Sequence, residues 1–163
     1  MKIWVLNHYA ANMYLDEAGR HQSLAKYLLD MGCDVDIFCA NTVPNSDVLI
    51  DTQGAEYVSK RGADDVRYTF IQTMPYHSNG RQRIGNMLDY YRKIKKVLLN
   101  KANGFGRPDI IIASSVHPLT LLAGEKIARK LNVPCICEIR DLWPETLVEL
   151  DIINKDNFFT KLM

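Results

Sequence analysis

The chain has 163 residues, of which 47% are hydrophobic, so it can bury one sizeable core but is too short for two ordinary domains. Twenty basic side chains against nineteen acidic ones leave a formal charge of +1, which gives no reason to expect a nucleic-acid partner. The four cysteines match no zinc or redox spacing, so we expect no metal site and free thiols in a reducing compartment.

The sequence also bears on location. No stretch approaches the roughly eighteen uninterrupted apolar residues that a membrane span needs. The first residues, MKIWVLN, lack the basic region and the cleavage site of a secretion signal. We therefore expect a cytoplasmic protein, at most peripheral on the inner face of the cell membrane.

Strands and helices alternate in the first forty residues. Residues 2–6 form a short apolar run typical of a buried parallel strand. Residues 19–31 have apolar side chains at helical spacing, and residues 34–40 (DVDIFCA) alternate into a second strand. The apolar face predicted for the helix contains Leu24, Leu28 and Met31. The length of the whole segment fits a βαβ unit with a right-handed crossover.

A second βαβ pattern occupies the later part of the chain. Residues 41–79 are less regular, with strand-like stretches near Tyr57 and over 66–73. An amphipathic helix is predicted over 84–99, and its expected buried face is Ile84, Met87, Leu88, Tyr91, Ile94 and Leu98. A buried strand (109–114), a helix that begins at a proline (118–131) and another strand (134–139) then follow. The alternation predicts an α/β, Rossmann-like three-layer domain with a mainly parallel sheet.

Polar residues follow the predicted strands at their carboxyl ends. His8 follows the first strand, His117 follows the strand 109–114, and Arg140 and Asp141 follow the last. Ligands of open α/β sheets bind beyond these ends, where the strand order reverses. If the order is the usual doubly wound one, His8 and His117 face the same crevice.

Each candidate residue has a functional and a structural interpretation. Gly19 begins the first helix, where it can let a phosphate approach backbone N–H groups, or it can simply serve a tight turn. Neither GxGxxG nor GxxxxGK[ST] occurs in the chain, which removes the main support for classical dinucleotide or P-loop binding. His117 can hydrogen-bond a sugar hydroxyl or take a proton near neutral pH, or it can be a structural loop residue. Arg140 or Asp141 can bind acceptor hydroxyls or phosphate, or Arg140 can form an ion pair with Asp141 or Glu138 that locks the loop.

The strongest local charge bias lies between residues 81 and 101. Seven basic side chains there oppose only Asp89. Such a run can be an ordinary solvated helix face, but on an amphipathic helix it also suits an anionic membrane surface or a diphosphate. The residues that we assign to a basic face for membrane or acceptor are Arg81, Arg83, Arg92, Lys95 and Lys96.

Three segments together resemble the N-terminal domain of family 4 glycosyltransferases of the GT-B fold. They are MKIWVLNHY, GRHQSLAKYLLDMGCDVDIF and SSVHPLTLLAGEKIARKLNVPCICEIRDLWPE. The RDLWPE part is fairly specific, whereas the rest is common to many Rossmann-like halves. The resemblance is closest to bacterial members that build surface polysaccharide on lipid carriers.

The resemblance implies that residues 1–163 are a single acceptor-side domain without the donor domain of such enzymes. It implies retaining transfer of a sugar from a nucleotide-sugar donor to a lipid-linked or oligosaccharide acceptor, with no metal or other cofactor. The loop around Gly19 then lies near the donor diphosphate, and His117 lies near the transferred sugar as the catalytic residue. His8, Arg140 and Asp141 join Gly19 in binding donor phosphate or acceptor.

Two departures and two alternatives accompany this interpretation. Ala18 stands where the family often has a first glycine, and Cys33 stands where it frequently has a histidine. Another GT-B enzyme, such as a sugar-nucleotide epimerase, would turn over a free nucleotide sugar without an acceptor. A non-catalytic α/β binding module, complete as it stands, is the second alternative.

Overall fold

The computed structural model of the chain describes residues 1–44, 46–76, 81–115 and 117–140. Within these residues the strands are β1 (Lys2–Leu6), β2 (Asp34–Ala40), β3 (Tyr57–Arg61), β4 (Arg67–Ile71), β5 (Ile110–Ser114) and β6 (Cys135–Glu138). The α-helices are α1 (Ala11–Leu15), α2 (Arg20–Asp30), α3 (Arg81–Leu99) and α4 (Pro118–Leu131). Short 3-10 turns lie at Ala63–Asp65 and Lys101–Asn103.

The strands form one sheet in the order β3-β4-β2-β1-β5-β6. All neighbouring strands are parallel except the antiparallel pair of β3 and β4. The predicted α/β, Rossmann-like fold with a mainly parallel sheet is thereby confirmed. The strand order reverses between β1 and β5, as expected for a doubly wound domain, so the carboxyl ends of these two strands flank the switch point.

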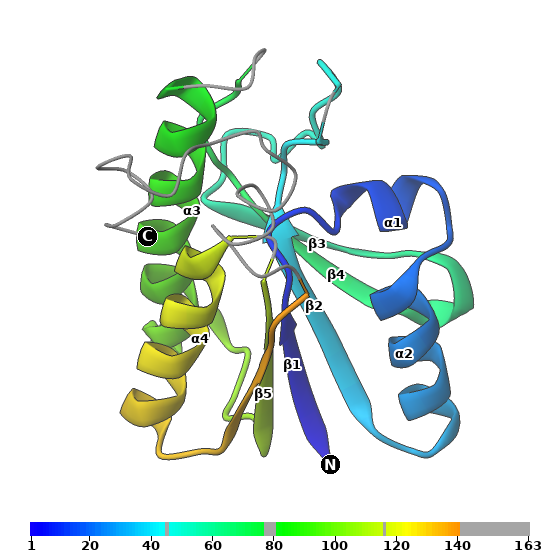
Figure 1. Ribbon diagram of the computed structural model, residues 1–163. Coiled ribbons are helices and arrows are strands. Elements are labelled where there is room, and N and C mark those ends of the chain that lie inside the picture. Colours follow the sequence, from blue (N-terminus) through cyan, green and yellow to red (C-terminus); the bar gives the residue numbers. More distant parts are fainter. Residues whose placement is uncertain (45, 77–80, 116, 141–163) are drawn as a thin grey trace, which may run out of the picture.

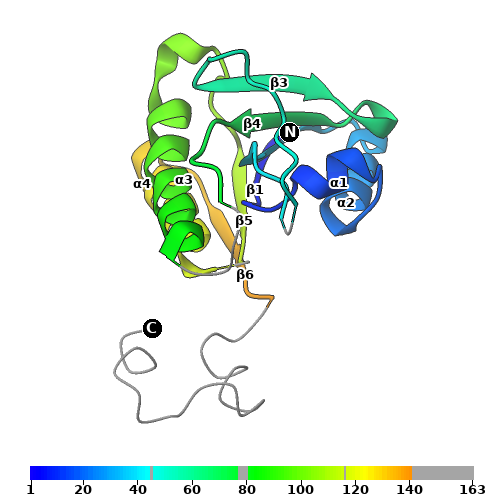
Figure 2. The ribbon, with the colours of Figure 1, turned by 90° about the horizontal axis from the view of Figure 1, so that it is seen from above.

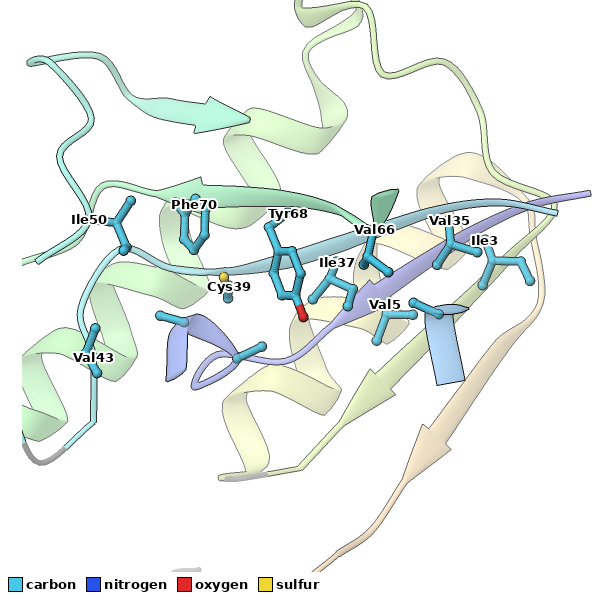
Figure 3. Close-up of a cluster of buried hydrophobic side chains, with 13 residues drawn as sticks. Ile3, Val5, Val35, Ile37, Cys39, Val43, Ile50, Val66, Tyr68 and Phe70 are labelled. Carbon is cyan, nitrogen blue, oxygen red and sulfur yellow. The ribbon is translucent and has the colours of Figure 1, made fainter. Parts of the chain in front are cut away.

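Helices cover both faces of the sheet, with α1 and α2 on one side and α3 and α4 on the other (Figures 1 and 2). Because side chains alternate along a strand, β1 supplies both cores. Ile3 and Val5 belong to the cluster packed against α1 and α2, which Figure 3 shows as a row of side chains along the sheet. Trp4 and Leu6 belong to the cluster packed against α3 and α4.

The ends of α2 and α4 explain why these helices begin and end where predicted. Gly19 precedes α2 with a φ of 125°, a conformation that side-chain-bearing residues avoid. Pro118 occupies the first turn of α4, and Asn132 ends that helix in the left-handed conformation. Gly124 lets α4 lie directly on β5, since a Cβ at this position would stand 2.5 Å from the Cβ of Ala113.

The predicted buried faces of two helices are partly wrong. In α2 the buried residues are His21, Gln22 and Ala25, whereas Met31 is 79% exposed. In α3 the buried residues include Asn86 and Tyr90, whereas the predicted Ile84 and Leu88 are 57% and 38% exposed and Tyr91 is only partly buried. The reason is that both helices turn polar side chains inward, where they hydrogen-bond buried groups. A pattern that counts only apolar residues does not register such positions.

The structure also bears on the expectations about thiols and membranes. None of the four cysteines forms a disulfide, and Cys39 is fully buried among apolar side chains. In the part of the chain that the structure describes, no helix is both long and apolar enough to cross a bilayer.

Candidate functional site

Two histidines that are far apart in the sequence meet at the switch point of the sheet. His8 follows β1, and His117 lies between β5 and α4. The Nδ1 atom of His8 lies 2.5 Å from the Nε2 atom of His117, and the two rings meet nearly at right angles. Both side chains are buried, with His8 at 0% and His117 at 6% exposure. The parallel arrangement of β1 and β5 therefore brings the two predicted site residues together.

Aromatic side chains hold this histidine pair in place. The ring of His8 stacks on Tyr90 of α3, with 4.3 Å between the centroids and an interplanar angle of 3°. The Tyr90 hydroxyl donates to the carbonyl oxygen of Phe38 at 2.9 Å, which anchors the stacked ring on β2. Tyr9 contacts both histidines, and Arg83 of α3 donates from Nε to the Tyr9 hydroxyl at 2.8 Å.

Burial keeps both imidazoles neutral. It lowers the pKa of His8 well below the ordinary value, and the neighbouring His117 lowers it further. Burial, assisted by the positive charge of Arg83, lowers the pKa of His117 to about 4. At neutral pH each ring therefore offers one N–H donor and one lone-pair acceptor. Such groups suit hydroxyls, which both donate and accept hydrogen bonds.

A third buried histidine forms a separate network beside the pair. His21 of α2 lies 2.9 Å from the Asn7 side-chain nitrogen through Nδ1, and 3.0 Å from the Glu138 carboxylate through Nε2. Arg20 also binds Glu138, with Nε 2.7 Å from the carboxylate. Burial by itself raises the pKa of Glu138, but the hydrogen bonds from Arg20 and His21 help to bring it below the ordinary value. The network joins the start of α2 to the carboxyl end of β6.

The other sequence candidates occupy different positions. Gly19 begins α2 as expected, but a Cβ there would lie 2.9 Å from the side chain of Met13, so the turn and this packing already account for the glycine. Arg140 follows β6, and its backbone N–H donates to the Ser115 hydroxyl at 2.9 Å. Asp141 lies outside the described residues. The alternative in which Glu138 pairs with Arg140 is wrong, because the Glu138 carboxylate binds Arg20 and His21.

The predicted basic face is divided between two regions. Arg83 lies in the first turn of α3 at the histidine pair, and it hydrogen-bonds Tyr9. Lys95 lies 12 positions later, which is about 18 Å along a helix at 1.5 Å per residue. Lys96 forms an ion pair with Glu56 of the loop before β3. Arg83 and Lys95 are therefore too far apart to bind one diphosphate together, whereas a basic face toward a membrane stays a prediction.

A hollow of about 590 Å³ lies between the carboxyl-terminal parts of α3 and α4. The residues that line it are Lys95, Lys96, Leu99, Lys126, Arg129 and Lys130. We call this set the α3–α4 groove. At its side, Lys95 Nζ lies 3.5 Å from the centroid of the Tyr91 ring, and Lys126 donates to the Tyr91 hydroxyl at 2.8 Å. The α4 lysines were not among the sequence candidates, because their alignment with α3 arises only when the two helices pack.

Several site residues were missed in the sequence. Tyr9, Asn86, Tyr90 and His21 all contact the networks at the carboxyl edge, yet none of them was among the candidate site residues. A polar residue at a buried helix position was the available signal for Asn86 and His21. Among the described residues, no three His, Cys, Asp or Glu side chains gather in a way that could hold a metal ion.

Comparison with known proteins supports the fold. No protein-family model matches the chain, and a search of curated proteins finds no match. Among solved structures, the chain is similar to the C-terminal domain (residues 78–226) of a hydrogenase from Pyrococcus furiosus, with a TM-score of 0.54 and 16% sequence identity. The alignment covers 84% of this chain and 89% of that domain. At this identity the similarity concerns the α/β fold alone.

Proposed function

We propose that this chain is the acceptor-side domain of a retaining glycosyltransferase. Its complete protein would move a sugar from a nucleotide-sugar donor to a lipid-linked or oligosaccharide glycan. The observation that carries the proposal is the buried, neutral pair of His8 and His117 at the switch point of a Rossmann-like sheet. The resemblance of the RDLWPE segment to family 4 glycosyltransferases supplies the reaction class; all of this segment but Arg140 lies outside the described residues.

The chemistry of the pair supports a role with sugar hydroxyls. A neutral imidazole can accept from one hydroxyl or donate to another, and its geometry is held by Tyr90 and Tyr9. Rigid positioning matters, because transition-state stabilisation requires groups that need no reorganisation during the reaction. In this proposal His117 contacts the transferred sugar, and Arg140 with the loop at Gly19 lies nearer to phosphate. No metal or organic cofactor takes part.

The test is a mass-spectrometric transfer assay on the complete gene product, with a panel of nucleotide sugars and lipid-diphosphate sugar acceptors. We expect His117→Gln to lower transfer by at least tenfold, about 1.4 kcal/mol in the barrier. Tyr68→Phe is the matched control, because it removes a hydroxyl that is hydrogen-bonded to Gln22 on the opposite face of the sheet. Transfer that persists in His117→Gln would remove the catalytic role of His117.

The same assay separates the alternative functions. Turnover of a nucleotide sugar without an acceptor would favour an epimerase. Absence of turnover with every donor, in a protein that folds, would favour a binding module.

We also propose that the α3–α4 groove holds the domain on an anionic membrane surface. Lys95 and Lys126 both lie within 5.5 Å of the Tyr91 ring centroid, and no carboxylate binds either ammonium group among the contacts of the described residues. An external phosphate would relieve the repulsion between these two cations. Lys130 adds a third charge at the same hollow.

Co-sedimentation with vesicles of phosphatidylglycerol and phosphatidylcholine tests this attachment. We expect the triple change of Lys95, Lys126 and Lys130 to Ser to reduce binding at low salt, whereas vesicles of phosphatidylcholine alone bind neither protein. The charge-matched control changes three cations on other elements, namely Lys26, Lys60 and Arg61, to Ser. Equal binding by the two triple variants would contradict a role for the groove.

A further inference from the structure

The orientation of Asn86 is determined by its surroundings. Its side-chain Nδ2 donates to the carbonyl oxygen of Met74 at 2.6 Å and to the Thr73 hydroxyl at 3.0 Å. A carbonyl oxygen can only accept, so the amide nitrogen must lie on that side. The Asn86 Oδ1 atom is consequently directed elsewhere, and it is buried without a hydrogen-bond partner among the described residues.

His8 carries the complementary buried atom. Its Nε2 is also buried without a hydrogen-bond partner among the described residues. Asn86 lies one helical turn before Tyr90, the ring that stacks on His8, so the amide oxygen of Asn86 and the Nε2 of His8 belong to neighbouring side chains. In agreement, burial lowers the pKa of His8 and Asn86 partly opposes this effect. An amide oxygen accepts hydrogen bonds, so it favours a proton on the facing nitrogen. His8 is then protonated on Nε2, and its Nδ1 is left as an acceptor.

The tautomer of His8 determines the tautomer of His117. His8 Nδ1 and His117 Nε2 are 2.5 Å apart, so one of them must donate. With His8 Nδ1 as the acceptor, the proton of this hydrogen bond belongs to His117 Nε2. A neutral imidazole has only one N–H, so His117 Nδ1 carries a bare lone pair. This Nδ1 is buried and has no partner among the described residues.

We propose that Asn86 and His8 are positioning residues that hold His117 in its Nε2–H tautomer and present its Nδ1 lone pair as a hydrogen-bond acceptor for a ligand hydroxyl. The proposal rests on the proposed function only for the kind of ligand. The direction of the hydrogen-bond chain follows from the carbonyl of Met74, and a substrate need not be bound to establish it.

The groups around the two histidines favour the neutral state of both imidazole rings. Tyr90 stacks on His8 from α3, Tyr9 contacts both rings from the loop after β1, and the Arg83 guanidinium lies 5.1 Å from the Tyr9 ring centroid. No carboxylate contacts either imidazole among the interactions of the described residues, so nothing there favours an imidazolium. A proton on both nitrogens of His117 would also remove its acceptor.

Long-range 1H–15N NMR spectra of the histidine rings in the 15N-labelled chain test the tautomers directly. Single His→Gln variants assign the four rings. We expect His8 and His117 both to carry their proton on Nε2, with Nδ1 unprotonated. A proton on Nδ1 of His117 would overturn the proposal, and the tautomers themselves are read from the unaltered chain.

The variant Asn86→Leu tests whether Asn86 determines the tautomers of His8 and His117. Without the amide oxygen, we expect a second population of both rings with the proton on Nδ1. Gln22→Leu is the matched control, because it removes a buried amide with comparable contacts on the other side of the sheet, and we expect it to leave both tautomers unchanged. Unchanged tautomers in a folded Asn86→Leu would overturn the role of Asn86.

Ligand binding separates this proposal from the proposed function. Asn at position 117 can retain an acceptor near the position of Nδ1, whereas Gln retains only the contact with His8. We therefore expect His117→Asn to keep more of the wild-type transfer than His117→Gln, by about tenfold if one neutral hydrogen bond is restored. If the rings have the expected tautomers but the protein transfers no sugar, and added sugar does not shift the His117 resonances, the positioning roles stand and the proposed glycosyltransferase function is rejected. Transfer with equal loss in both variants would reject Nδ1 as the contacting atom.

Discussion

The buried histidines predict that the folded chain loses stability in mild acid. His117 has a pKa of about 4 in the folded chain, against about 6.5 for an exposed histidine. Between these values the unfolded state binds a proton that the folded state does not. The contribution of His117 is therefore fully present above about pH 6.5 and decreases as the pH falls toward the folded pKa. At pH 5 the free energy of unfolding should be lower by about 2 kcal/mol from this residue alone.

Urea unfolding at several pH values between 8 and 4.5, followed by circular dichroism, measures this loss. His8 and His21 contribute with the same sign, because burial also lowers their pKa values. The comparison is made with His117→Gln, whose amide can still donate to His8 but does not titrate. The pH dependence of the variant should be shallower by about 2 kcal/mol at pH 5. Parallel curves for the two proteins would show that His117 titrates normally when folded, and would refute the reasoning.

Two further predictions concern the packing of the sheet and the ion pairs of Arg67. Gly124→Ala should destabilise the chain, because the new methyl group would stand 2.5 Å from the Cβ of Ala113. Overpacking costs about 1–3 kcal/mol, which exceeds the gain of about 1 kcal/mol in helix propensity. Thermal unfolding measures the difference. Asp36→Asn should lower the free energy of unfolding by about 2 kcal/mol, since Asp36 is buried and bound by Arg67. Asp34→Asn is the control: it alters a 51% exposed partner of the same arginine and should lower the free energy of unfolding less. Urea titration at pH 7 compares the two variants.

Local pattern alone was enough to predict most of the elements. The strands β1 and β2 and the helix α4 have the predicted bounds, because apolar runs and a proline at the first helical position are local signals. The parallel sheet and its switch point also followed from the alternation of strands and helices. Helix α1, with five residues, was not predicted, since so short an element has little periodicity to detect.

Only the tertiary structure decided which side chains act together. Placing His8 and His117 at the carboxyl ends of their strands was possible from sequence, but their 2.5 Å contact depends on the adjacency of β1 and β5 and on their register. The choice of Tyr90 rather than Tyr91 as the buried ring depends on the rotation of α3 about its axis. In this rotation Asn86 is buried and hydrogen-bonded to Thr73 and Met74, whereas Ile84 and Leu88 stay exposed. Sequence periodicity measures hydrophobicity along one element, whereas these contacts depend on how separate elements satisfy one another's polar groups.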